Sequence, residues 1–353
     1  MANSSSNLSG KIQTVLGVLD PEKLGVTLSH EHLSLDSSAL AWPWKEEKFA
    51  SQVHTPVNLE NLWWIQHNPY SNCANLRLFE SEDAVLEEIK FFKSNGGCSI
   101  VENTVIGIRR NIKFYKQVAM ETGVNIVSGT GFYVESSRPN TVSFTCEKMA
   151  EMMKSDILDG ADGTDIKCGV IGEIGCSWPL RGSERRALQA AAHTSTETGC
   201  PIIIHPGRYH EAPTEIIRVI QEAGGDVQKV VMSHLDRTFQ KKDDLLEFAK
   251  LGCYCEYDLF GIEQSHYQLN AAVDMPSDAQ RIQWVKALID EGYEDKITIG
   301  HDIHTKHRLM RFGGHGYSHI LINIVPRMQS RGINKKSIDK MLVDNPKKWL
   351  TFK

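Results

Sequence analysis

Eight short apolar runs alternate with helical stretches along the chain, and this alternation limits the possible folds more than any other feature. Strands that alternate with helices pair in parallel through right-handed crossovers, and eight such units fit a (β/α)8 TIM barrel of the α/β class. The expected strands are 25–33, 98–103, 124–128, 168–174, 201–205, 229–234, 253–258 and 296–302. The expected helices are 80–95, 111–122, 144–158, 183–198, 212–223, 241–250, 277–291, 317–329 and 335–343, the last ended by Asn345-Pro346.

An open, doubly wound sheet is the structural alternative to the barrel. Its dinucleotide-binding version carries a glycine-rich phosphate loop after the first strand, and no such loop follows Leu33. The 353 residues are expected to form one domain, with an N-terminal hairpin at about 10–22. The long loop at about 36–79 is rich in Trp, Pro and Tyr, which favours an ordered excursion and a partial lid over disorder.

Composition excludes several classes of partner and location. A net charge of -5 without a long basic run argues against nucleic acid and against an anionic membrane surface. No apolar stretch approaches the roughly 20 residues that span a bilayer, and the polar N-terminus lacks an apolar signal core. Eight scattered cysteines without a CxxC pair indicate a reduced protein of the cytoplasm, in the cytosol.

Side chains that commonly bind metals end five of the eight predicted strands. His30 and His32 close the first strand at positions i and i+2, so both rings share one face, roughly 6.6–7 Å apart along the chain. Active sites of such barrels lie at the C-terminal ends of the strands, where these side chains would converge. The six candidate metal ligands are His30, His32, Glu173, His205, His234 and Asp302.

Each candidate ligand also has a structural interpretation of its own. A strand-end histidine can bond a loop carbonyl, Glu173 can pair with Arg181, and Asp302 can cap a turn. An ionised carboxylate inside an apolar strand, however, needs a partner or a metal. Four histidines and two carboxylates exceed the three protein ligands of one catalytic zinc site. They suit two divalent ions that share a bridging carboxylate, with zinc expected although manganese, cobalt and iron accept similar ligands.

Four motifs around these ligands carry a family resemblance. They are GEIGCSWPL at 172–180, HPGR at 205–208, SHLDR at 233–237 and HDIHTK at 301–306. With the HEH of the first strand, they resemble the phosphotriesterase branch of the amidohydrolase superfamily, and most of all its animal phosphotriesterase-related members. The resemblance runs from about Gly10 to Lys353. One departure from the bacterial enzymes is Glu173, which stands where they have a carbamylated lysine, and this argues against organophosphate hydrolysis.

The resemblance implies both ligand roles and an activity. It implies that His30, His32 and Asp302 hold one metal ion, that His205 and His234 hold the other, and that Glu173 bridges them. For the animal branch it implies an amidase that cleaves N-acyl taurines, chiefly N-acetyltaurine, into taurine and acetate. A metal-bridging hydroxide would attack the acyl carbon, with Asp302 acting as general base and then as general acid.

A substrate with a sulfonate group needs a cationic pocket. Arg208 and Arg237 each follow a ligand-bearing strand by three residues, and Arg109 follows the second strand. The planar fork of arginine suits an oxyanion, although each of these side chains could instead pair with an acid such as Asp236. Tyr133, after the third strand, could line the same pocket or pack beneath a loop.

Two other functions remain open from the sequence. The same six ligands would serve a metal-dependent lactonase or phosphotriesterase, because the loops decide which substrate fits. A protein that keeps its metals but acts only by binding belongs to another class, and the complete ligand set argues against it. The expected partner is a small N-acyl amino-sulfonate, without nucleic acid or membrane, and an oligomer is not excluded.

Overall fold

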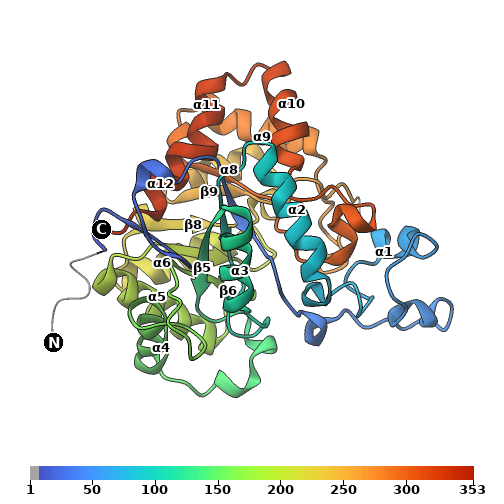
Figure 1. The fold of residues 1–353 in the computed structure, drawn as a ribbon, viewed down its shortest axis with the longest axis horizontal. Helices are drawn as coiled ribbons and strands as arrows, with labels where there is room; N and C mark the ends of the chain where they lie inside the picture. Colours follow the sequence, from blue (N-terminus) through green and yellow to red (C-terminus); the bar gives the residue numbers. More distant parts are fainter. Residues whose placement is uncertain (1–7, 265) are drawn as a thin grey trace.

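Eight parallel strands form one sheet that curves into a barrel, as Figure 1 shows for the computed structural model, which describes residues 8–264 and 266–353. Their order in the sheet follows the chain, and every neighbouring pair is parallel. The strands are β3 (Thr27–Glu31), β4 (Ser99–Glu102), β5 (Asn125–Thr130), β6 (Val170–Gly175), β7 (Ile202–His205), β8 (Val230–Met232), β9 (Tyr254–Tyr257) and β10 (Ile297–Ile299). The predicted (β/α)8 barrel is confirmed.

The barrel closes where the end of β10 meets β3. The Asp302 amide donates to the His30 carbonyl at 3.1 Å. A Cβ added at Gly300 would lie 2.7 Å from the same carbonyl, so the two backbones approach too closely there for any side chain. This seam places the end of the last strand directly against the HEH segment of the first.

Helices follow the strands at nearly all the predicted positions. They are α1 (Leu62–His67), α2 (Glu82–Ser94), α3 (Ile112–Thr122), α4 (Cys146–Leu158), α5 (Gly182–Thr198), α6 (Ala212–Glu222), α7 (Leu235–Thr238), α8 (Lys242–Ala249), α9 (Asp278–Asp290), α10 (Val325–Ser330), α11 (Lys335–Asp339) and α12 (Asn345–Leu350). The short helices α1 and α7 were not predicted, because one or two turns are too brief to show a helical period.

The predicted end of the last helix at Asn345-Pro346 is wrong. The helix continues from α11 through a π-helical segment, Lys340–Asp344, into α12. Pro346 lies in the first turn of α12, where its missing N–H removes no hydrogen bond of that segment. A proline therefore marks a change in helical hydrogen bonding here and not a helix end.

The N-terminal hairpin and α12 close one end of the barrel. β1 (Ile12–Thr14) and β2 (Gly17–Leu19) pair antiparallel, and the Trp349 indole donates to the Ile202 carbonyl at 3.2 Å. Buried side chains from six strands of the barrel, β4 to β9, meet there with Ile12 of β1. The cluster comprises Ile12, Leu24, Val101, Val127, Val170, Ile203, Val231, Tyr254, Trp349 and Leu350.

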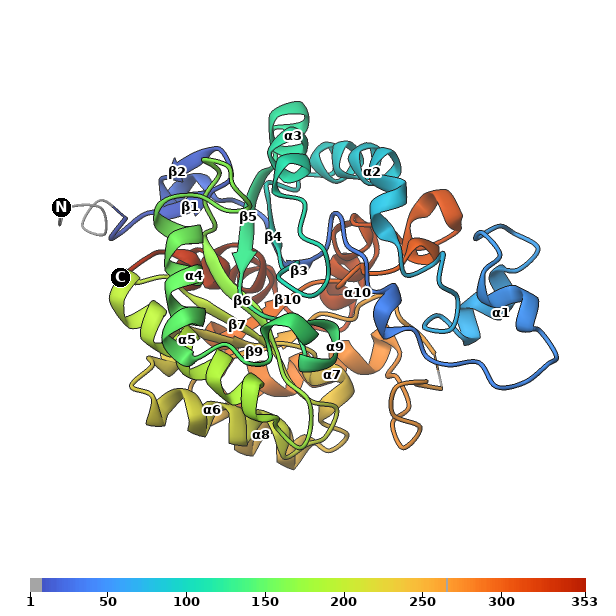
Figure 2. The same ribbon diagram turned by 90° about the horizontal axis from the view of Figure 1, so that it is seen from below.

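The 36–79 segment is a hydrogen-bonded excursion that contains α1. The Trp42 amide donates to the Tyr70 carbonyl at 2.7 Å, and the Ser37 amide donates to the Leu76 carbonyl at 3.0 Å. In Figures 1 and 2, α1 lies on the opposite side of the molecule from the C-terminus.

Among the described residues, no helix combines the length and the apolar character that crossing a membrane requires.

Glu88 on α2 supplies a pH-dependent test of the packing around the barrel. Burial raises its pKa to about 7, and it is 4% exposed. The unfolded chain loses this proton near pH 4.5, so stability falls as pH rises from there through about 7. Glu88→Gln removes this titration. The free energy of unfolding of Glu88→Gln minus that of the wild type should therefore be about 2 kcal/mol larger at pH 8 than at pH 5. Urea unfolding of both proteins at the two pH values measures this difference. The same difference at pH 5 and at pH 8 would contradict the prediction.

Candidate metal centre

The six predicted ligands lie together at the end of the barrel opposite the hairpin. His30, Glu173 and His205 stand within or at the ends of their strands, and His234 and Asp302 follow β8 and β10. The pairing register shifts between Leu28 and Glu31 on β3 and between Ile171 and Ile174 on β6. Such irregularities re-aim side chains near active sites, and here they fall at His30 and Glu173.

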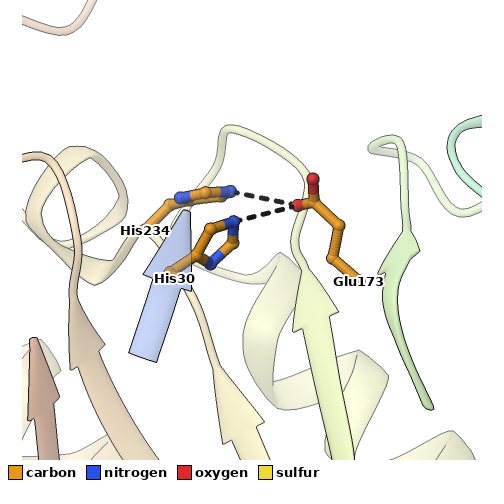
Figure 3. A group of neighbouring side chains, drawn as sticks. All are labelled: His30, Glu173 and His234. Carbon is orange, nitrogen blue, oxygen red and sulfur yellow. Dashed lines mark ion pairs between the residues drawn. The ribbon is translucent and has the colours of Figure 1, made fainter. Parts of the chain in front are cut away.

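Glu173 is the centre of the group, and imidazole nitrogens surround its carboxylate. Figure 3 shows His30, from β3, and His234, from the turn after β8, pointing at the same carboxylate oxygen. The distances from Glu173 oxygens are 3.1 Å to His205 Nδ1, 3.3 Å to His32 Nε2, 3.6 Å to His30 Nε2 and 3.6 Å to His234 Nε2. A buried carboxylate surrounded by imidazole nitrogens belongs to a group that could hold a metal ion.

The remaining donors contact the histidines around Glu173. Asp302 Oδ1 lies 3.2 Å from His32 Nε2 and 3.7 Å from His30 Nε2. His205 Nδ1 lies 2.9 Å from His234 Nε2. His30 belongs to two groups that could hold a metal ion, one with Glu173 and His234 and one with His32 and Asp302. His30 Nε2 is buried and has no hydrogen-bond partner in residues 8–264 and 266–353. A buried nitrogen without a partner, facing carboxylates and imidazoles, fits a metal ligand.

The outer nitrogens of three histidines are held by a second set of side chains. His30 Nδ1 lies 3.1 Å from Glu256 Oε2, and His32 Nδ1 lies 2.8 Å from Thr104 Oγ1. His234 Nδ1 lies 2.8 Å from Asp258 Oδ1. These contacts fix the ring orientations and leave the inner nitrogens for metal. Sequence reasoning missed Glu256, although a carboxylate inside a buried strand is the same signal that identified Glu173.

Two of the ligand residues have left-handed backbone conformations. φ is +57° at His234 and +50° at Asp302. Non-glycine residues adopt this region rarely, at a cost of about 1–3 kcal/mol, and retain it only where the surroundings impose it. His234 lies two residues beyond the end of β8 and Asp302 three residues beyond the end of β10, so the chain turns at these two residues.

The electrostatics of the group keep its carboxylates ionised. Burial alone would raise the pKa of Glu173, but hydrogen bonds from His205, His234 and His32 hold that pKa well below its usual value. Burial likewise opposes ionisation of Asp302, and the imidazoles, His304 first, hold its pKa well below the usual value. Metal ligands must be deprotonated, so both side chains are in the form that binds.

A cavity of about 270 Å³ opens over the ligands. Its walls combine apolar side chains from the 36–79 excursion and neighbouring loops with a few polar groups. The apolar lining comprises Leu35, Leu40, Trp42, Leu76, Ile108, Val134, Leu259, Leu269 and Met275, and the polar lining includes Tyr70, Tyr133, Arg208, Arg237, Tyr267 and His304. A small apolar pocket with convergent polar groups is the usual form of a small-molecule site.

Three of the four predicted substrate contacts lie in this pocket. Arg237 is buried, donates through Nη2 to the Pro206 carbonyl at 3.0 Å, and its Nη1 has no partner among the described residues. Arg208 donates through Nε to the Tyr267 hydroxyl at 2.7 Å. The Tyr133 hydroxyl lies 3.3 Å from His205 Nδ1. A cationic wall therefore stands beside the candidate ligands His205 and His234.

Arg109, the fourth predicted contact, lies outside the pocket. Its guanidinium stacks on the Phe79 ring, 3.9 Å from the centroid, and the residue is exposed. Its left-handed φ of +64° turns the chain after Ile108, so Ile108 lines the pocket in its place. Sequence reasoning missed Tyr70 and Tyr267, because they belong to loops distant in sequence and carry no periodic signal.

A profile of the phosphotriesterase family matches residues 10–350. The chain belongs to the phosphotriesterase family. The family resemblance of the four motifs is confirmed, and membership makes the chain a metal-dependent hydrolase. The N-acetyltaurine hydrolase of Xenopus tropicalis is 56% identical over 349 residues, 99% of this chain and 100% of that protein. The N-acetyltaurine hydrolase of Homo sapiens is 55% identical over 351 residues, again 99% of this chain and 100% of that protein.

Solved structures of the phosphotriesterase family share the fold. A resiniferatoxin-binding protein from Rhodobacter sphaeroides has a TM-score of 0.93 and 30% identity, covering 99% of this chain and 98% of that chain. A phosphotriesterase homology protein from Escherichia coli has a TM-score of 0.76 and 27% identity, covering 94% of this chain and 100% of that chain. The fold is therefore shared with proteins that bear different names.

Proposed function

We propose that this chain hydrolyses N-acetyltaurine to taurine and acetate. The observation that carries the proposal is 54–56% identity, over 99% of the chain, to proteins named N-acetyltaurine hydrolase. The pocket supports it, because a cationic wall for a sulfonate lies beside a carboxylate–histidine group at the mouth of the barrel. All eight cysteines are free, which supports a reducing location, and we propose the cytosol.

Two divalent ions, zinc in the first instance, are proposed for the ligand group. His30, His32 and Asp302 would hold one ion, His205 and His234 the other, and Glu173 would lie between them. When bound, such a pair supplies an activated water and polarises the acyl carbonyl.

Asp302 is proposed to move the proton during hydrolysis. Its Oδ1 lies on the ligand side, 3.2 Å from His32 Nε2, and its Oδ2 lies 3.1 Å from His304 Nδ1. The water oxygen bonds to the acyl carbon, the C–N bond breaks, and the proton passes through the Asp302 carboxylate to the leaving nitrogen. An amine leaves poorly without this proton, so an amide substrate makes the second transfer essential.

Arg237 and Arg208 are proposed to bind the sulfonate. Within residues 8–264 and 266–353, the buried Nη1 of Arg237 has no partner, and Arg208 is held in place by Tyr267. Charged hydrogen bonds from two guanidinium groups would orient the anionic end, while Tyr133 lies next to His205 at the reacting end.

Metal removal provides the test. Purified protein loaded with zinc should release taurine from N-acetyltaurine, a sample treated with chelator should lose this activity, and re-addition of zinc should restore it. N-ethylacetamide, which lacks the sulfonate, serves as the matched substrate and should give a kcat/KM lower by about two orders of magnitude or more. Loaded protein that cleaves lactones or phosphotriesters but releases no taurine would contradict the proposal.

A further inference from the structure

Five backbone polar groups at and beside Asp302 are held by hydrogen bonds. Asp302 lies three residues beyond the last residue of β10 and has the left-handed φ of +50°. Its own amide donates to the His30 carbonyl at 3.1 Å. The other four groups, the amides of His301 and Ile303 and the carbonyls of His301 and Asp302, contact two buried side chains of opposite charge.

Glu31 accepts the two flanking amides. It is the middle residue of the HEH segment, and its carboxylate contacts the turn that carries Asp302. Its Oε1 accepts from the His301 amide at 2.8 Å, and its Oε2 accepts from the Ile303 amide at 3.2 Å. The His301 ring adds a third contact, with Nδ1 2.6 Å from Oε1. Glu31 is fully buried, so these bonds replace all of its contact with water.

Arg308 holds the two carbonyls from the other side of the turn. It is buried, and its Nη2 and Nη1 donate to the carbonyls of His301 and Asp302 respectively. Glu31 comes from the first strand and Arg308 from the 3-10 helix Lys306–Arg308 after the last. A carboxylate and a guanidinium therefore enclose one strained turn.

We infer that Glu31 and Arg308 are positioning residues that fix the Asp302 carboxylate for proton transfer. We call this pair the Asp302 clamp. The role of the clamp in proton transfer rests on the proposed function. Its hydrogen bonds to the backbone do not depend on that function. A displacement of about 1 Å in a reacting group can cost about 100-fold in rate, so a turn with an unfavourable φ needs this restraint. Glu31 acts through Asp302 and is not among the residues that line the pocket.

Glu31→Gln tests the clamp with minimal change of shape. The amide nitrogen of glutamine donates and cannot accept, so one of the two flanking amides loses its partner. We expect kcat for N-acetyltaurine to fall by about 10- to 100-fold, with KM changed less than about three-fold and the metal content unchanged. In an Asp302→Asn background, the same substitution should cost less than about three-fold, because residues that act as a unit are not additive.

Glu184→Gln is the matched control. Glu184 is also a buried glutamate that accepts backbone amides, from Ser177, Arg181 and Glu135, but it lies on α5 and contacts none of residues 301–303. The Glu184→Gln substitution should lower the stability of the protein and leave kcat within about three-fold of that of the wild type. Two results would overturn the clamp. One is that Glu31→Gln lowers kcat by the same factor in the wild type and in Asp302→Asn. The other is that Glu184→Gln lowers kcat as much as Glu31→Gln does.

Hydrogen exchange tests the clamp without any substrate. Amides of the 299–304 segment should exchange at least about ten-fold faster in Glu31→Gln and in Arg308→Lys than in wild type, while those of β6 and β7 stay unchanged. Unchanged exchange at 299–304 would overturn the inference whatever the protein hydrolyses. If the wild type releases no taurine but the 299–304 amides exchange faster in the two variants, the proposed function is contradicted and the clamp stands.

Discussion

Asp302→Asn is expected to lower kcat for N-acetyltaurine by about two to four orders of magnitude, with KM changed little. Asparagine keeps the shape of the side chain and an oxygen toward His32, but it cannot take up the proton and deliver it to the leaving nitrogen. The loss should therefore fall on turnover and spare the binding of the anionic end. Steady-state kinetics with metal content measured on the same sample provides the measurement.

Asp162→Asn is the matched control for this prediction. Asp162 is another aspartate with a left-handed φ, +54°, and it pairs with Arg110 away from the ligand group. The same exchange of oxygen for nitrogen there should leave kcat unchanged within about two-fold. A turnover of Asp302→Asn close to that of wild type, with full metal content, would remove Asp302 from the role of proton carrier.

Glu173→Gln should have the second large effect, on metal content. The carboxylate lies within 3.6 Å of all four histidine ligands, and a neutral amide offers one accepting oxygen where two anionic oxygens stood. We expect the variant to retain fewer than two ions per chain after gel filtration and to lose about three orders of magnitude or more in kcat/KM.

Metal analysis by mass spectrometry measures this loss, and thermal unfolding gives an independent readout. Zinc should raise the Tm of the wild type, because an ion that binds only the folded state stabilises it, and the rise should be much smaller in Glu173→Gln. Glu184→Gln again serves as the control and should keep its ions. A Glu173→Gln sample with two tightly held ions would contradict the bridging role.

Much of the site follows from local rules and could be predicted. The period of two along a strand puts His30 and His32 on one face whatever surrounds them. A carboxylate inside the apolar run around Glu173 needs a partner, and parallel strands that each end in a ligand bring those ends to one rim. Alternation of strands and helices fixed the barrel by the same logic, because right-handed crossovers leave few topologies for eight such units.

Contacts between distant segments could not be predicted in this way. Arg237 and Arg109 had equal claims as sulfonate contacts, yet one lies buried in the pocket and the other stacks on Phe79 at the surface. Tyr70 and Tyr267 reach the pocket through loops whose course depends on their packing. A side chain in a loop has no period, so only the folded chain decides which way it faces.

The sequence by itself therefore determined which residues end the strands, and with them the barrel and the six candidate ligands. Only the tertiary structure decided how those ligands are held: the left-handed turn at Asp302, and its enclosure by Glu31 and Arg308. The physical reason is the distance along the chain between the residues that interact. Strand and helix periods are set by neighbours in the chain, whereas the hydrogen bonds of this turn join the first strand to the last, 270 residues apart.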